Sequence, residues 1–98
     1  MQLQLYGKKI WVYRQPIDFR CSIDGLSSFV MDELKQKPQD GIYLFYNLGR
    51  DKVKCLSWHK NGFILLYKRL ENGRFCFTYN PSMLTIEIGI DERSGPHR

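Results

Sequence analysis

The chain has 98 residues, of which 43% are hydrophobic and 26% charged, as in folded domains rather than disordered segments. No apolar run approaches the roughly 18–20 residues that span a bilayer, and the first residues lack the layout of a signal peptide. We therefore expect no membrane partner and a cytoplasmic protein, with one domain over residues 1–92 and a disordered tail over residues 93–98.

The net charge of +5 is concentrated in one part of the chain. Residues 50–74 carry seven basic and two acidic residues, whereas the rest of the chain is neutral overall. Such a segment predicts one electropositive surface, suited to a polyanion or to an acidic partner. A solvated hairpin surface that only keeps a small domain soluble is the alternative interpretation.

The first half of the chain predicts one strand and one helix. Residues 9–14 (KIWVYR) are typical of a strand, and Pro16 ends it because proline lacks an N–H group. Asp18 and Asp24 are then candidate N-caps. A helical stripe follows at Leu26, Phe29, Val30 and Leu34. Lys35 and Lys37 are expected near the C-terminus of this helix, which Pro38 ends.

The second half predicts short strands joined by tight turns. The strand-like runs are residues 42–46, 53–58, 63–70 and 74–79, and Asn61-Gly62 and Asn72-Gly73 are turn signals between them. Loops this short favour antiparallel neighbours, with the third run central and covered on both sides. The predicted fold is α+β: a small antiparallel β-meander of four to five strands with one main α-helix packed on one face.

The segment after Asn80 carries two opposed signals. Asn80-Pro81 is typical of a helix start, whereas the following TIEIGI alternates as a strand does. The prediction is a short helix or irregular segment over residues 81–88.

No pattern of an enzyme or a metal site is found. Phosphate-binding GxxxxGK[ST], zinc-binding HExxH and nucleophilic GxSxG motifs are absent from the sequence. His59 is expected in a turn and His97 in the tail, positions that do not hold a general base in place. Metal-dependent nucleases need converging carboxylates, and the candidates are Asp18, Asp24 and Asp51, which are better explained as caps and a turn residue. We expect no catalytic residue, no metal and no cofactor.

The three cysteines do not form a recognisable framework. Cys21, Cys55 and Cys76 are odd in number and include no CxxC pair, which argues against both disulfides and zinc. They are predicted to be small buried hydrophobic residues.

The basic segment is the main candidate site, for nucleic acid. Phosphate contacts are expected from Arg50, Lys52, Lys54, Lys68, Arg69 and Arg74, with Tyr67 stacking on a base. Alternation places Lys54 on one face of its strand with Leu56 and Trp58. The other aromatic residues of this region, Trp58, Phe63, Phe75 and Phe77, are predicted to lie in the core.

Three blocks of the sequence resemble one known family. Residues 16–30 (PIDFRCSIDGLSSFV) resemble its PTDMRKGxDGLAxLV signature, residues 44–75 contain its YKRLExGRF block as YKRLENGRF, and residues 88–91 (IGID) match its closing GID. The family is that of the TnpB, or Orf2-like, accessory proteins of insertion sequence family 66 transposons. The basic run after Asn47 is two charges poorer here than in the family pattern.

This resemblance implies a non-catalytic accessory protein of bacterial DNA transposition, acting beside a separate transposase. Binding to DNA at the transposon ends through the basic hairpin region is the first hypothesis. The alternative is a protein-interaction adaptor that docks on the cognate transposase without touching DNA. A nucleic-acid enzyme in its own right would need the three aspartates to converge. The sequence leaves the oligomeric state open.

Overall fold

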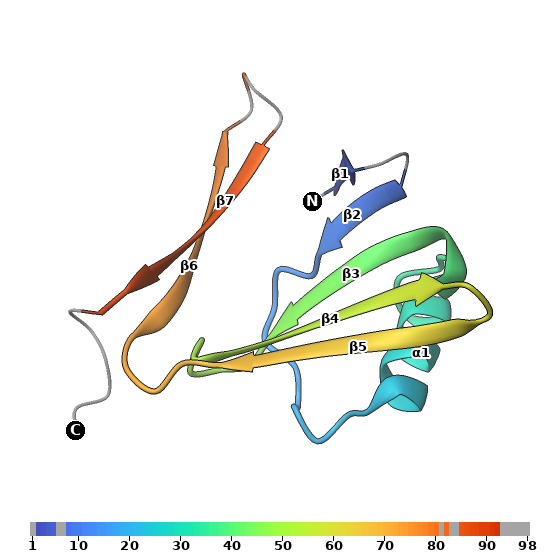
Figure 1. The fold of residues 1–98 in the computed structure, drawn as a ribbon, viewed down its shortest axis with the longest axis horizontal. Coiled ribbons are helices and arrows are strands. Elements are labelled where there is room, and N and C mark those ends of the chain that lie inside the picture. The colour runs from blue at the N-terminus through green and yellow to red at the C-terminus, as the bar shows by residue number, and fades with distance from the viewer. Residues whose placement is uncertain (1, 6–7, 81, 83–84, 93–98) are drawn as a thin grey trace.

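One helix and two β-sheets make up the fold (Figure 1). The structure is a computed structural model that describes residues 2–5, 8–80, 82 and 85–92. Its elements in chain order are β1 (Gln2–Leu5), β2 (Lys8–Val12), α1 (Ile23–Asp32), the short 3₁₀ helix η1 (Pro38–Asp40), β3 (Gly41–Tyr46), β4 (Lys52–His59), β5 (Gly62–Arg69), β6 (Arg74–Asn80) and β7 (Thr85–Asp91). The prediction of an α+β fold with one main helix is confirmed.

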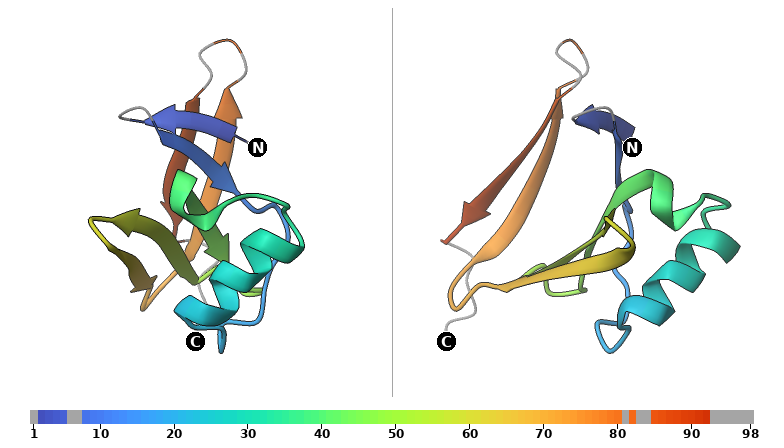
Figure 2. Two further views of the ribbon diagram at one scale, coloured as in Figure 1. Left: turned by 90° about the vertical axis from the view of Figure 1, so that its right-hand side faces the viewer. Right: turned by 45° about the vertical axis from the view of Figure 1, so that its right-hand side comes forward.

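The larger sheet has the strand order β1-β2-β3-β4-β5 and is mixed rather than purely antiparallel. Strand β2 pairs in parallel with β3, with Ile10 opposite Ile42, and the other neighbours are antiparallel. The parallel pair follows from the chain path, because a parallel partner requires a long crossover, and here α1 provides it. Figure 2 shows α1 on one face of this sheet.

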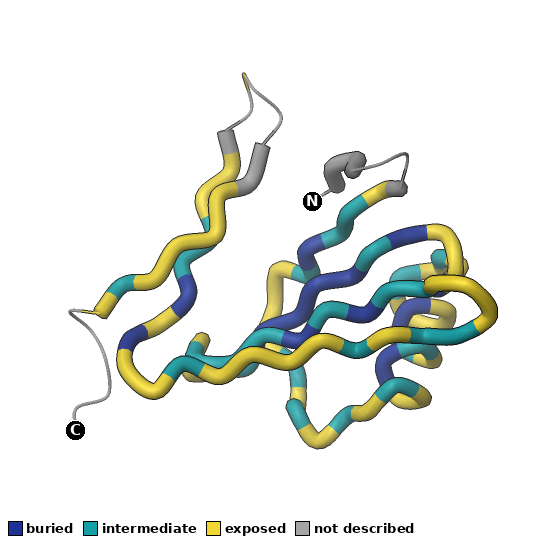
Figure 3. Tube along the Cα trace, in the orientation of Figure 1, coloured by how far each residue is buried: buried dark blue, intermediate teal, exposed yellow. Residues whose placement is uncertain are grey.

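The buried core lies between α1 and the face of the sheet that it covers. Leu26 and Val30 of the helix pack against Tyr43, Phe45 and Leu56 of the strands. The dark segments of α1, β3 and β4 in Figure 3 mark this layer. The predicted helical stripe is therefore the core face of the helix, with Phe29 and Leu34 partly buried beside it.

The helix begins within one residue of the predicted start at Asp24 but ends earlier than predicted. Its N-cap is Ser22 rather than Asp18 or Asp24, and Asp24 lies in the first turn. It ends at Asp32 because the chain turns soon afterwards, with Lys35 in the left-handed region at a φ of 55°. Lys35 and Lys37 thus lie beyond the helix, and Pro38 begins η1 instead of ending α1.

Strand β6 leaves the larger sheet, so the predicted four-strand meander is wrong at its last strand. It pairs with β7 in a separate two-stranded sheet, called here the arm. Figures 1 and 2 show the arm diverging from the larger sheet. The turn at Asn72-Gly73 is not a hairpin: Gly73, at a φ of 90°, directs the chain away from β5.

Two further predictions are corrected by this departure. Strand β5 is an edge strand rather than a central one, and its Leu66 side chain is 62% exposed. Residues 85–88 of the segment predicted as a short helix or irregular structure belong to β7, so the alternating pattern of TIEIGI was the better signal. Residues 81, 83 and 84 of that segment, and the tail predicted over residues 93–98, lie outside the described residues.

The tight turn between β4 and β5 is present, displaced by one residue. Lys60 and Asn61 occupy its centre, with positive φ values of 43° and 73°, as a type I′ turn requires. Gly62 already belongs to β5. None of the helices in the described residues is long and apolar enough to cross a membrane.

The cysteines are free thiols but are less buried than predicted. All three are only partly buried. Burial raises the pKa of the Cys55 thiol.

Candidate nucleic-acid interface

Basic residues gather where the β3–β4 loop meets the connection between β5 and β6. The backbone N–H of Leu70 donates to the carbonyl of Asp51 at 2.7 Å, and that of Phe75 donates to the carbonyl of Arg50, also at 2.7 Å. These two bonds join segments about twenty residues apart in the sequence. The resulting group, called here the basic corner, consists of Arg50, Lys52, Lys68, Arg69 and Arg74.

The β3–β4 loop is held in shape by Asn47. Its amide Nδ2 donates to Asp51 Oδ1 at 2.6 Å, and its Oδ1 accepts the backbone N–H of Lys52 at 2.9 Å. The bond from Asn47 lowers the pKa of Asp51, so this carboxylate stays negative. With the loop closed in this way, Arg50 adopts a left-handed backbone at a φ of 59° and is exposed.

Strand register places the remaining cations around the end of the sheet. Lys52 lies opposite Arg69, and Val53 lies opposite Lys68. Because side chains alternate along a strand, Arg69 shares the helix-covered face with Tyr67, whereas Lys68 lies on the other face. Arg74 follows at the start of the arm. The basic corner therefore extends over both sides of the sheet end.

Two of the five cations form ion pairs with nearby carboxylates. Arg69 Nη2 lies 3.0 Å from Glu71, and Lys52 Nζ lies 3.6 Å from Asp51. Within the described part of the chain, Arg50, Lys68 and Arg74 form no ion pair. The Arg50 guanidinium instead lies 5.5 Å from the centroid of the Tyr46 ring. Three cations thus remain available at the basic corner.

Lys54, one of the predicted phosphate contacts, does not belong to the basic corner. It is 8% exposed, and its ammonium donates to the carbonyls of Phe19 at 2.8 Å and Cys21 at 2.5 Å. The same ammonium lies over the rings of Phe19 and Tyr67, at 5.0 and 5.6 Å from their centroids. Lys54 therefore fastens the loop before α1 to the sheet. The sequence alternation had placed Lys54 on the same strand face as Leu56, and because Leu56 is buried, this pattern already indicated that Lys54 faces the core.

Tyr67, the predicted stacking residue, is partly accessible. One side of its ring makes an edge contact with Phe19, with 6.1 Å between the centroids, and the residue is 54% exposed. It lies next to the basic corner on β5, on the same face as Arg69. Of the aromatic residues predicted to be core, Phe75 is buried, and Trp58, Phe63 and Phe77 are partly buried.

The three aspartates considered as metal ligands lie on different elements. Asp18 precedes α1, Asp24 is in its first turn, and Asp51 is in the β3–β4 loop. In the described residues, no three His, Cys, Asp or Glu side chains form a group that could hold a metal ion. His59 is exposed at the end of β4, and His97 lies outside the described residues.

Asp18 is engaged by a neighbouring arginine at the surface. The Arg20 guanidinium binds both oxygens of its carboxylate, the shortest bond being 2.6 Å, and the Arg20 backbone N–H donates at 2.9 Å. These hydrogen bonds lower the pKa of Asp18 to about 2. The carboxylate is therefore ionised at neutral pH, in a form suited to a structural ion pair rather than to proton transfer.

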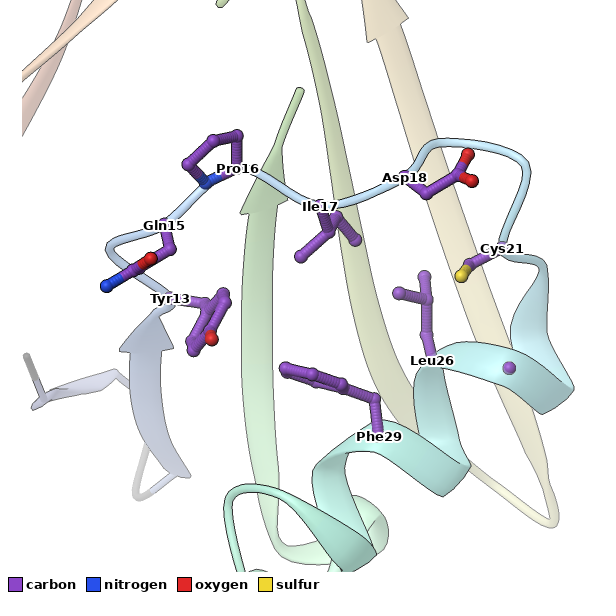
Figure 4. Close-up of a pocket in the computed structure, with 9 residues that line it drawn as sticks. Tyr13, Gln15, Pro16, Ile17, Asp18, Cys21, Leu26 and Phe29 are labelled. Carbon is purple, nitrogen blue, oxygen red and sulfur yellow. The ribbon is translucent and has the colours of Figure 1, made fainter. Parts of the chain in front are cut away.

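A cavity of about 330 Å³ lies between α1 and the segment that follows β2. Tyr13, Ile17, Leu26 and Phe29 are among the residues that line it, and the Asp18 carboxylate points away from them (Figure 4). The lining is mainly apolar and offers no pair of acid and base groups. The basic corner therefore remains the candidate site.

The sequence matches the family described as IS66 Orf2 like protein over residues 8–92. "Uncharacterized protein y4jC" of Sinorhizobium fredii (strain NBRC 101917 / NGR234) is similar, with 39% identity over 72 residues. The alignment covers 72% of this chain and 62% of that relative, so the chain spans less than two thirds of the relative's length. No solved structure matches the chain.

Proposed function

Because the chain belongs to the IS66 Orf2-like family of transposition accessory proteins, we propose that it binds DNA without catalysing a reaction. In this role the basic corner contacts the phosphates of a transposon end in the cytoplasm, while a separate transposase performs the strand chemistry. In this role the chain supplies affinity for the transposon end and positions that DNA for the transposase.

The observation that carries this proposal is the joining of the two loops at the end of the sheet. The bonds of Leu70 to Asp51 and of Phe75 to Arg50 bring five cations into one region. Neutralising DNA phosphates with clustered Lys and Arg side chains releases counterions, which is the main source of sequence-independent affinity. Asp51 and Glu71 are the carboxylates of the same segment, and the register of the arm places Asp91 opposite Arg74.

The cations of the basic corner are expected to contribute unequally to the affinity for DNA. Arg50, Lys68 and Arg74 are exposed and form no ion pair within the described residues, so they contact phosphate without losing a partner. Lys52 and Arg69 exchange surface ion pairs that are worth only about 0–1 kcal/mol. Tyr67 offers its exposed side to an unpaired base. Lys54 supports the site from inside the fold.

A binding titration at two salt concentrations tests the proposal. We expect the full chain to bind a short fluorescein-labelled duplex from a transposon end, with affinity falling steeply between about 50 and 200 mM salt. Removing two contacts with Lys68→Ala and Arg74→Ala should weaken binding and lower the slope of log K against log salt by about 2. Fluorescence anisotropy measures both quantities.

A matched control removes the same charge from the other end of the sheet. Lys9 lies opposite Gly41, the first residue of β3, and Lys37 precedes η1, and both are exposed. The pair Lys9→Ala and Lys37→Ala should leave the salt slope close to that of the unmodified chain. Equal losses in both double variants would contradict a localised site.

The adaptor alternative gives a different result in the same experiments. If the basic corner docks on the transposase instead, the chain will not bind the duplex even at low salt. It will then co-purify with the transposase after nuclease treatment, and Lys68→Ala with Arg74→Ala will abolish that co-purification. This outcome would replace DNA by the transposase as the partner of the basic corner.

A further inference from the structure

The face of the larger sheet opposite α1 is apolar but only partly covered. Alternation from the register of β3, β4 and β5 places Leu44, Tyr46, Cys55, Ile64 and Leu66 on this face. Leu44 and Tyr46 are buried, whereas Ile64 and Leu66 on the edge strand β5 are exposed. We call this face, from Leu44 to Leu66, the open face.

The arm also has one apolar face. The register of β6 with β7 places Phe75, Phe77 and Tyr79 on the same side as Ile88 and Ile90. At the base of the arm, Phe77 stacks on Tyr46 of the open face, with 5.2 Å between the centroids and an interplanar angle of 27°. Ile88 and Ile90, which lie opposite Phe77 and Phe75 in the register, remain 52% and 47% exposed. Towards its far end the arm diverges from the sheet (Figure 2).

These two faces hold most of the exposed apolar surface. Among the described residues, eight large hydrophobic side chains are exposed, and five of them lie on the open face or on the apolar face of the arm. The five are Ile64, Leu66, Tyr79, Ile88 and Ile90. Exposed apolar side chains concentrated in this way mark an interaction surface.

We propose that a second copy of the chain covers both faces, each copy laying the apolar face of its arm on the open face of the other. Both faces are apolar. A single two-fold axis therefore buries the arm of each copy on the open face of the other and closes the assembly as a dimer. The exchange also gives the apolar face of the arm a surface to pack against. A two-stranded sheet needs such packing because it is only marginally stable alone in water.

Within one copy the arm covers the open face at Tyr46 but leaves Ile64 and Leu66 exposed, because the base of the arm is held in position. The Phe75 N–H is bonded to the Arg50 carbonyl, and Gly73 is buried against the backbone of Asp91 and Glu92. These contacts direct β6 away from β5, so that the arm's outer part and the exposed half of the open face stay apart within one copy (Figure 1).

Charge favours a second copy over an anionic occupant. Residues 75–92 contain three acidic residues and no Lys or Arg, whereas the segment that carries β4 and β5 is strongly basic. An arm that approaches the open face of another copy therefore meets opposite charge at its edges, beside Lys68. Nucleic acid or an anionic lipid surface would meet the arm's like charge instead.

The molecular mass in solution tests the exchange. Sedimentation equilibrium should show a dimer for the full chain and a monomer for Leu66→Asp and for Ile88→Asp, because each substitution places a carboxylate in both copies of the interface. The control is Met31→Asp, at an exposed position of α1, the helix that covers the other side of the sheet, and this variant should remain a dimer. All three sites are exposed, and circular dichroism checks that each variant is folded.

A mixture of the two variants provides the sharper test. The unmodified arm of Leu66→Asp fits the unmodified open face of Ile88→Asp, so mixing them restores one of the two interfaces. We expect a heterodimer, with a dissociation constant weaker than that of the unmodified dimer. A mixture that stays monomeric would overturn reciprocal exchange.

Two other results would also overturn the proposal. One is a full chain that is monomeric at every concentration, which would leave the faces to a different partner. The other is a dimer that persists in both Leu66→Asp and Ile88→Asp. Because mass is measured without DNA, neither result bears on the binding of DNA by the basic corner.

Discussion

The lysines of strand β4 differ in role although they are two residues apart. Lys52 is the first residue of the strand and lies beside Asp51, whereas the ammonium of Lys54 is enclosed by two carbonyls and two aromatic rings. Charge-assisted hydrogen bonds to the carbonyls offset the cost of burying Lys54. A basic residue in a basic segment is thus not necessarily a nucleic-acid contact.

The substitution Lys54→Met tests this role of Lys54. Methionine fills a similar volume but leaves the carbonyls of Phe19 and Cys21 without their donor, so we expect a loss of about 1–3 kcal/mol in the free energy of unfolding. Urea denaturation measures the loss. DNA binding by the folded variant should keep its salt slope.

The control is Lys52→Met, which removes a surface ion pair and should cost no more than about 1 kcal/mol. A Lys54→Met variant that is as stable as the unmodified chain, but whose DNA binding has a lower salt slope, would show that Lys54 contacts phosphate instead of stabilising the fold.

At the scale of secondary-structure elements, the connection between β5 and β6 decides the architecture. A tight hairpin there would have continued the sheet and covered β5. Instead Gly73 takes a left-handed backbone, and a Cβ atom at this position would lie 2.7 Å from the carbonyl oxygen of Asp91. Glycine is required there because of both the backbone conformation and the close approach of β7.

We expect Gly73→Ala to lower the free energy of unfolding by about 1–3 kcal/mol, through backbone strain and displacement of the arm. The matched control is Gly62→Ala, since Gly62 has ordinary backbone angles and open space around its Cβ position. Its effect should stay within about 0.5 kcal/mol. Urea denaturation of the two variants measures the difference, and equal midpoints would show that Gly73 does not constrain the arm.

Across the whole molecule, stability is expected to be uneven. The layer of α1, β3 and β4 contains the five side chains of the core cluster, whereas the arm is attached to the body by Phe75 and by the stacking of Phe77 on Tyr46. Segments with few buried apolar contacts open locally at lower free energy than the core.

Hydrogen exchange followed by mass spectrometry measures this difference. Amides of β6 and β7 should exchange faster than those of β3 and β4, and the gap should widen on dilution if a second copy covers the arm. Equal protection throughout the chain at all concentrations would mean that the arm and the body unfold as one unit.

Much of the local structure was predictable because it depends on short-range patterns. The helical stripe from Leu26 to Leu34 and the alternation along β4 marked residues of the core, and period and turn residues are local properties. The alternation along β5 did not show that only one of its faces is covered. The basic segment and the family motifs were also readable in order along the chain.

What the sequence by itself determined is therefore the α+β composition, the location of the excess charge and the family. Only the tertiary structure decided the parallel pairing of β2 with β3, the departure of β6 into the arm and the separation of Lys54 from the basic corner. The physical reason is distance along the chain. Lys54 binds a carbonyl 35 residues away, and Phe75 binds Arg50 across the whole β4–β5 hairpin. No local pattern encodes such contacts, which exist only once the chain has folded.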